Sequence, residues 1–158
     1  VVDLVGHDAR VVPVGRLDID TSGVLLLTND GDLAHRLTHP RFEHEKEYIV
    51  EHGGGLDPQK FAKLAHGVRI DDVITQRAGV AKTTSRKFRI TLREGRHHQI
   101  RRMLERVGSR VLALHRLAIG PVRLGELPRG AHRPLTMTGS VTAIESIGKP
   151  VTGPYLQR

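Results

Sequence analysis

The feature that most constrains this chain is the apolar segment Gly23-Val24-Leu25-Leu26-Leu27-Thr28. Successive side chains of a strand point to opposite faces, so an uninterrupted apolar run predicts a strand buried on both sides. Such a strand belongs at the centre of a sheet that other elements cover. We therefore expect a layered fold with residues 23–28 as a central strand.

The rest of the chain alternates short strand patterns with short helical patterns. The spacing of apolar residues predicts helices over 33–37, from Pro58 to Gly67 and from Ile100 to Val107. Strand patterns cover residues 46–50, much of 68–92 and residues 111–117. Because strands and helices do not follow a regular βαβ repeat, we expect an α+β fold with a mixed sheet.

Length and composition narrow the organisation of the chain. Its 158 residues correspond to one domain, which we expect to span residues 1–148 and to be followed by a loosely ordered tail over 149–158. Residue 1 is Val, which suggests a fragment or a processed chain. Cysteine is absent, so no disulfide, thiolate metal site or cysteine nucleophile exists. With no apolar span or secretory signal, we expect a cytoplasmic protein without membrane contact.

The charge of the chain indicates its class of partner. A formal net charge of +8 favours a polyanion, and nucleic acid is the first candidate. Aromatic residues make up only 3% of the chain, which argues against a surface of many stacked bases. A single inserted base is still compatible with this composition.

A polar loop before the apolar run carries two carboxylates. Its sequence is Gly15-Arg16-Leu17-Asp18-Ile19-Asp20-Thr21-Ser22. Loops beside a rigid sheet often hold functional groups, but Asp18 and Asp20 are equally understood as caps for nearby backbone amides. A carboxylate beside Arg16 stays ionised at neutral pH, as a nucleophile requires.

A second polar cluster covers residues 94–103 and includes Arg96, His97, His98, Arg101 and Arg102. If Ile100 and Met103 mark the apolar face of this helix, Arg101 lies on its flank and Arg102 points nearly opposite. Arg101 is then able to turn toward the core and pair with a carboxylate. Arg102 faces solvent or a polyanion.

Metal and nucleotide cofactors have little support in this sequence. Adjacent His97 and His98 would point about 100° apart on a helix and would not share a metal. His35 and His39 have a four-residue spacing, but Pro40 disfavours helical geometry at His39. Phosphate-binding glycine fingerprints are also missing. We expect no metal site and no cofactor.

Several segments, in order and spacing, resemble the pseudouridine synthases that modify ribosomal RNA, in particular the branch containing the small-subunit enzyme A and the large-subunit enzyme B. The resemblance extends from Val14 to Thr136. Its main segments are Gly15-Arg16-Leu17-Asp18, Thr21-Ser22-Gly23, Leu25 to Gly31, His39-Pro40, Lys46-Glu47-Tyr48, Glu94-Gly95-Arg96, Arg101-Arg102-Met103, Leu114-His115-Arg116 and Ile119-Gly120-Pro121.

The resemblance implies a largely antiparallel sheet flanked by helices, with a central RNA-binding cleft that receives a flipped-out uridine. It implies that Asp18 is the catalytic aspartate, that Tyr48 packs on the target base, that Arg101 pairs with Asp18 and that Leu114 lines the pocket. Arg16, Arg96, Arg102 and Arg116 become candidate phosphate-binding residues. Without the family, Tyr48 would be interpreted as a half-buried tyrosine of a strand.

The expected activity is isomerisation of uridine to pseudouridine in ribosomal RNA. Residues 37–40 and 67–72 look more like the large-subunit enzyme B, which favours large-subunit (23S) RNA. Members of this branch usually begin with a small RNA-binding module, which we expect to be absent from this chain, and we expect a monomer. Two alternatives are a non-catalytic module for ribosomal RNA binding or ribosome assembly, and a metal-dependent hydrolase that uses Asp18 and Asp20.

Overall fold

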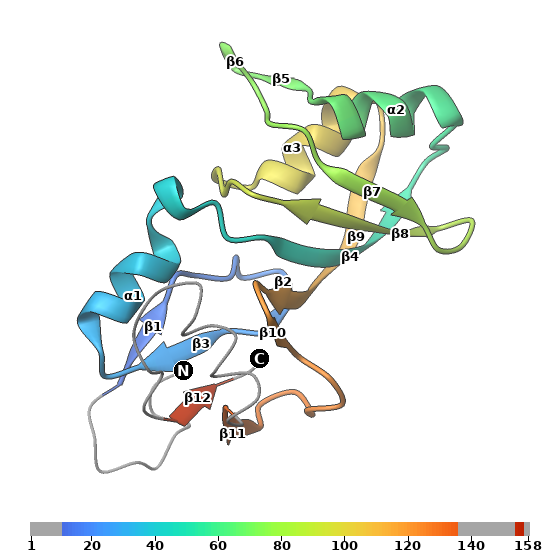
Figure 1. Cartoon of the computed structure of the whole chain (residues 1–158). Coiled ribbons are helices and arrows are strands. Elements are labelled where there is room, and N and C mark those ends of the chain that lie inside the picture. Colours follow the sequence, from blue (N-terminus) through green and yellow to red (C-terminus); the bar gives the residue numbers. More distant parts are fainter. Residues whose placement is uncertain (1–10, 136–153, 157–158) are drawn as a thin grey trace.

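The structure is a computed structural model that describes residues 11–135 and 154–156. Its largest element is a mixed sheet of six strands. Its long path consists of the antiparallel neighbours β7 (Gly79–Lys82), β8 (Lys87–Leu92), β4 (Lys46–Gly53) and β9 (Arg110–Ile119) (Figure 1). Two short strands also pair with β9: β10 (Val122–Arg123) is antiparallel to it, and β2 (Thr21–Gly23) is parallel. The predicted α+β fold with a mixed, largely antiparallel sheet is confirmed.

Helices α2 (Pro58–His66) and α3 (Gln99–Arg106) pack on one face of this sheet (Figure 1). The Asp57 carboxylate accepts a hydrogen bond of 2.8 Å from the backbone amide of Lys60, so it caps α2 as its sequence predicts. Strand β8 turns its apolar residues toward the helices and its charged residues outward. The buried side chains of this larger core include Val50, Leu64, Phe88, Ile90, Ile100, Met103, Leu104 and Leu114.

A second, smaller core lies around the N-terminal elements. Strands β1 (Val12–Val14) and β3 (Leu26–Thr28) form an antiparallel ribbon, and α1 (Gly31–Thr38) packs against it. Asp30 caps α1 by accepting a hydrogen bond of 3.0 Å from the amide of Leu33. Buried residues of this core are Val14, Val24, Leu26, Ile119, Val122 and Leu124. Strand β9 contributes Leu114 to the larger core and Ile119 to the smaller one, so it connects the two.

Residues 23–28 do not form the single central strand that the apolar run predicts. β2 ends at Gly23 beside β9, and β3 begins at Leu26 beside β1. Gly23 permits this change of partner because its φ is 121° and a Cβ there would lie 2.2 Å from the carbonyl oxygen of Arg116. The predicted burial on both faces is correct, since residues 24–27 are all buried.

The remaining elements are short. A 3-10 turn, η2 (Pro40–Phe42), follows α1, and the ribbon of β5 (Arg69–Ile70) and β6 (Val73–Ile74) follows α2. Strand β11 (His132–Pro134) pairs with β12 (Pro154–Leu156), which lies within the predicted tail over 149–158. The partner of β12 lies earlier in the chain, so the local pattern could not reveal the strand. The rest of that tail lies outside the described residues.

None of the helices in the described ranges is both long enough and apolar enough to span a membrane.

Candidate active site

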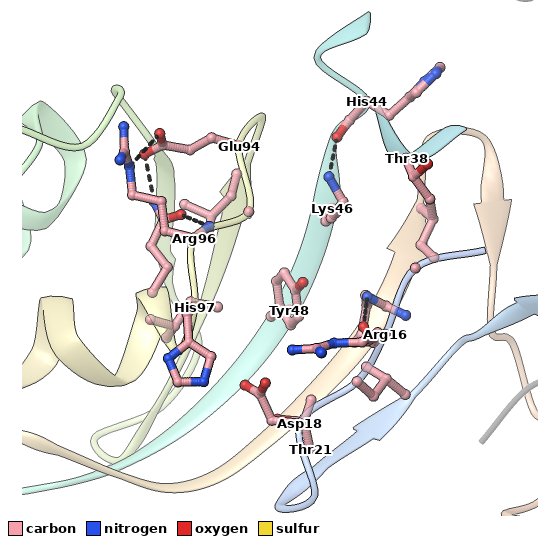
Figure 2. A pocket seen from close by; sticks show the side chains of 18 of the residues that line it. Arg16, Asp18, Thr21, Thr38, His44, Lys46, Tyr48, Glu94, Arg96 and His97 are labelled. Atoms are coloured by element: carbon pink, nitrogen blue, oxygen red, sulfur yellow. Dashed lines mark hydrogen bonds and ion pairs between the residues drawn. The ribbon is translucent and has the colours of Figure 1, made fainter. Parts of the chain in front are cut away.

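A cavity of about 340 Å³ lies between the two cores. Its walls come from the loop after β1, the segment around η2, strands β4 and β9, and the turn that leads into α3 (Figure 2). The cavity brings together all but one of the residues that the resemblance assigned to catalysis or RNA binding: Arg16, Asp18, Tyr48, Arg96, Arg101, Leu114 and Arg116. The exception is Arg102.

Asp18 projects into this cavity from the turn between β1 and β2. Its backbone carbonyl accepts a hydrogen bond of 2.9 Å from the amide of Thr21, which closes the turn. Among the described residues, no backbone amide donates to the Asp18 carboxylate, so Asp18 does not act as a loop cap. Its side chain is 29% exposed and points toward Tyr48 (Figure 2).

The nearest charged partner of Asp18 is His98, which the sequence did not single out for this role. His98 Nε2 lies 3.6 Å from Asp18 Oδ1, and the two form an ion pair when the imidazole is protonated. His98 precedes α3 with a φ of 50°, a left-handed conformation that costs a non-glycine residue about 1 kcal/mol. Its ring stacks on that of His97, with 4.0 Å between ring centroids. A strained residue beside a carboxylate is a common mark of a functional site.

Arg101 reaches the Asp18 loop by a different contact from the predicted one. Its Nη2 donates a hydrogen bond of 3.0 Å to the backbone carbonyl of Asp20. Within the described part of the chain, no Arg101–Asp18 ion pair is formed. Helical geometry predicted the direction of Arg101 correctly, but its guanidinium donates to the backbone carbonyl of Asp20 and not to the Asp18 carboxylate. Arg101 therefore fixes the position of the loop that carries Asp18.

Tyr48 and Leu114 lie on the same face of the β4–β9 ladder. Leu114 pairs with Val50 and Arg116 pairs with Tyr48, so this face passes from the apolar core to the floor of the cavity. Tyr48 is half-buried and packs against the larger core, while Leu114 is only 6% exposed. An aromatic ring on a rigid strand is well placed to stack on a flat ligand.

Arg116 is buried, whereas an arginine that binds phosphate at the surface would be exposed. Its side chain is 4% exposed. Nε donates to the carbonyl of Val24 at 2.8 Å, and Nη1 donates to the carbonyl of Arg16 at 3.3 Å. Arg116 thus ties β9 to both ends of the segment that contains Asp18. Its alternation with Leu114 and Ala118 along β9 was a sequence signal that it points inward.

Arg96 and Arg102 face different surroundings. Arg96 lines the cavity, and its Nε lies 3.1 Å from Glu94, which also accepts a hydrogen bond of 2.6 Å from Gln99. Arg102 instead pairs with Asp71, in the turn between β5 and β6, and lowers the pKa of that carboxyl. The predicted opposition of Arg101 and Arg102 on α3 is correct, but Arg102 is not part of the cavity.

Among residues 11–135 and 154–156, no cluster of three or more His, Asp or Glu side chains is suited to hold a metal. The cavity instead combines the carboxylates of Asp18, Glu43 and Glu94 with several cationic or neutral nitrogen groups and an aromatic floor.

The family model described as RNA pseudouridylate synthase matches residues 2–106. The chain belongs to this family.

Relatives of known name support the same family. The chain is 43% identical to ribosomal small subunit pseudouridine synthase A of Salmonella typhimurium, over 77% of this chain and 54% of that protein. It is 40% identical to the dual-specificity RNA pseudouridine synthase RluF of Escherichia coli, over 86% of this chain and 47% of that protein. A crystal structure of a pseudouridylate synthase has a TM-score of 0.78 and 37% identity, and the match covers 81% of this chain and 57% of the other. The chain spans about half the length of the curated relatives it matches.

The predicted membership of the pseudouridine synthase family is therefore confirmed. The finer preference for the large-subunit enzyme B stays a prediction.

Proposed function

We propose that this chain isomerises uridine to pseudouridine in ribosomal RNA, with Asp18 as the catalytic carboxylate. The observation that carries the proposal is the position of Asp18, which faces Tyr48 across a cavity of about 340 Å³. That volume lies in the range of small-molecule sites, which begins at about 300 Å³, and suits one extruded nucleoside. Family membership makes this chemistry the expected one.

The reaction needs no external oxidant, reductant or group donor. The bond between ribose C1′ and uracil N1 breaks, the uracil rotates, and a bond between C1′ and C5 forms. C5 then loses its proton, and N1 gains one. An ionised carboxylate beside the sugar can attack C1′ as a nucleophile, or it can remove a sugar proton on a route through a glycal. Asp18 serves either route, because it is a partly exposed carboxylate at the cavity.

The surroundings of Asp18 hold its carboxylate in place. His98 lies 3.6 Å from its carboxylate, and Arg101 anchors the loop through the carbonyl of Asp20. We assign Arg101 a positioning role, together with an electrostatic one through the positive charge that it adds near Asp18. Preorganised charges of this kind lower a barrier because they need little rearrangement during the reaction.

The floor and rim of the cavity account for substrate binding. Tyr48 stacks on the uracil, and Leu114 closes the apolar side of the pocket. Arg16 and Arg96 are exposed at the cavity and contact phosphates of the RNA. Extruding a base costs a few kcal/mol of stacking, which these contacts offset. The net charge of +8 supports a polyanionic partner.

We place the target in large-subunit ribosomal RNA because residues 37–40 and 67–72 resemble the large-subunit enzyme B. One of the relatives is named for the small subunit and another for dual specificity, so the identity of the target RNA is a separate question from the reaction. Mapping pseudouridines in ribosomal RNA from a deletion strain, with and without complementation, answers it. A lost site in small-subunit RNA alone would contradict the large-subunit assignment.

The substitution Asp18→Asn tests the proposed function. RNA carrying tritium at C5 of uridine releases it to water when pseudouridine forms, and we expect Asp18→Asn to reduce release by more than about 10³-fold, in line with loss of an essential nucleophile or base. RNA affinity should be nearly unchanged, since a carboxylate contributes nothing favourable to phosphate binding.

Asp20→Asn is the matched control, because Asp20 is an exposed carboxylate in the same turn and only its backbone carbonyl contacts Arg101. It should retain activity. Full activity of Asp18→Asn would refute the catalytic role. Salt-sensitive RNA binding by the wild-type chain without any release would instead support the non-catalytic module.

A further inference from the structure

The cavity contains polar groups that nothing in the protein satisfies. Three buried side-chain atoms in the described residues lack a hydrogen-bond partner: Thr21 Oγ1, His44 Nε2 and Arg116 Nη2. All three residues line this cavity. Buried polar groups are nearly always paired in proteins, and an unpaired buried guanidinium nitrogen is especially costly. Their concentration at one cavity indicates that a polar ligand completes it.

Lys46 lies near two of these residues, His44 and Arg116. Its Nζ donates a hydrogen bond of 3.3 Å to the carbonyl of His44. Burial and the positive charge of Arg116 lower the pKa of Lys46, and burial and Lys46 both lower the pKa of His44. Figure 2 shows Lys46 above Tyr48 along β4, on the side of the cavity away from Arg96 and His97. Two cationic side chains, those of Lys46 and Arg116, therefore lie near each other on one wall, next to the backbone of His44.

No carboxylate of the cavity neutralises this wall. Asp18 faces His98, Glu94 is bound by Arg96 and Gln99, and Glu43 is exposed and forms no ion pair with a described residue. Within the described part of the chain, neither Lys46 nor Arg116 has an ion-pair partner. Two cations near each other in a partly buried place repel, so a bound anion would relieve both the repulsion and the missing hydrogen bonds.

We infer that Lys46 and Arg116 form a subsite for a phosphodiester group of the RNA, next to the nucleotide whose base stacks on Tyr48. The inference rests on the proposed function, because it assumes that this nucleotide enters the cavity. A phosphodiester supplies one negative charge and several acceptor oxygens, which suit the Lys46 ammonium and Arg116 Nη2. The subsite would hold the sugar of the target at a fixed distance from Asp18, so it would act on binding and on rate.

The substitution Lys46→Gln tests the subsite in the full chain. The ligand is an RNA hairpin containing the mapped target uridine, and affinity is measured at several salt concentrations. We expect about tenfold weaker RNA binding and a slower single-turnover rate. The slope of log K against log salt concentration should become smaller by about 0.7, which is the value for one lost contact to a single-stranded phosphate. Lys82→Gln is the matched control, because Lys82 is an exposed strand lysine that does not line the cavity.

A second measurement keeps the protein unchanged. Neutral methylphosphonate groups replace, one at a time, the phosphates around the target uridine in the hairpin. One replacement should weaken binding to the wild-type chain about tenfold and should add nothing further in Lys46→Gln, as expected for two changes that remove one contact. Equal losses in both proteins at every position would overturn the inference, whether or not Lys46→Gln also affects folding.

Inorganic phosphate distinguishes the RNA backbone from a free anion. If millimolar phosphate raises the melting temperature of the wild-type chain but not of Lys46→Gln, and no methylphosphonate affects binding, the ligand is free phosphate and the RNA assignment is wrong. Absence of tritium release by the wild-type chain would refute the proposed function. Normal release with identical affinity, salt dependence and rate in Lys46→Gln and Lys82→Gln would refute the subsite alone.

Discussion

The two sides of the cavity differ in how their polar groups are satisfied. On the side of α3, Glu94 is held by Arg96 and Gln99, Arg101 is bound to the carbonyl of Asp20, and His98 faces Asp18. On the opposite side, Arg116 Nη2 has no hydrogen-bond partner, and the ammonium of Lys46 contacts only the backbone carbonyl of His44. We call the first side complete, because its charged groups face partners within the protein, and the second side incomplete, because Arg116 and Lys46 have no ion-pair partner among the described residues.

This difference separates two tasks that one site must perform. Groups that act on the reacting bond gain from a fixed arrangement, because preorganised charges need no rearrangement in the transition state. Groups that capture a substrate gain from unmet hydrogen bonds, because the ligand then supplies the missing partners. We interpret the α3 side as the part that fixes Asp18 and the β4–β9 side as the part that captures RNA.

The largest expected effect comes from Gly23→Ala, which disrupts the contact between β2 and β9 on which both sides of the cavity depend. The new Cβ would lie 2.2 Å from the carbonyl oxygen of Arg116, in a backbone conformation that disfavours a side chain. We expect the free energy of unfolding, measured in urea, to fall by about 3 kcal/mol or more. Activity should fall with it, because β2 and the Asp18 turn would move away from β9.

Gly55→Ala is the control for this change. Nothing lies within 4 Å of a Cβ at Gly55, so its unfolding free energy should stay within about 0.5 kcal/mol of the wild-type value. Equal stability of Gly23→Ala and Gly55→Ala would show that the close approach of β2 and β9 is not required.

Arg101→Ala removes the anchor on the complete side. We expect the rate of tritium release to fall about 100-fold, because the Asp18 turn loses its contact with α3 and Asp18 loses a nearby positive charge. Stability should fall by only about 1 kcal/mol, since the hydrogen bond to Asp20 is exposed to water. Arg101→Lys, which retains the charge but loses the geometry of the guanidinium, should recover only part of the rate. Wild-type activity in both variants would show that Arg101 has no role in the reaction.

The smallest expected effect is on the pH dependence of the free energy of unfolding, through His44 on the incomplete side. Burial, assisted by Lys46, lowers the pKa of His44 in spite of a hydrogen bond with the backbone of Arg36 that raises it. The unfolded chain then takes up a proton at His44 near the ordinary pKa of about 6.5, at which the folded chain does not. The stability that neutral His44 provides is present above that pH and is lost as the pH falls toward the folded pKa.

The measurement is the free energy of unfolding between about pH 7.5 and pH 5, the range that brackets the ordinary histidine pKa, on the wild-type chain and on His44→Gln. The decline should be slightly shallower in His44→Gln. Parallel curves for the two proteins would show that His44 is not protected from protonation, and would weaken the distinction between the two sides.

Local patterns predicted much of the fold, because several elements are specified by neighbouring residues. Asp57 and Pro58 begin α2, and the alternation of residues 87–92 identifies the buried face of β8. The division of residues 23–28 could not be predicted, because it depends on β9 approaching Gly23 from a distant part of the sequence. The pairing of β12 with β11 is non-local for the same reason.

The candidate site shows the same limit at the level of side chains. Helical geometry indicated that Arg101 and Arg102 point in opposite directions, but not that Arg101 binds a backbone carbonyl or that Arg102 binds Asp71. The sequence argued against a metal shared by His97 and His98 and gave His98 no role beside Asp18, because its left-handed backbone conformation and its approach to Asp18 depend on the tertiary structure. Such partners are set by the packing of distant segments.

The parallel pairing of β2 with β9 also has a consequence for how the protein folds. Thr21 pairs with Leu114, so this contact closes a very long loop, and such contacts carry a high entropic cost before they form. The β7–β8 hairpin is much more local and can form earlier. During synthesis the Asp18 turn must therefore wait for β9 to leave the ribosome, and the chain acquires its reactive centre long after the residues of that centre's first loop have been made.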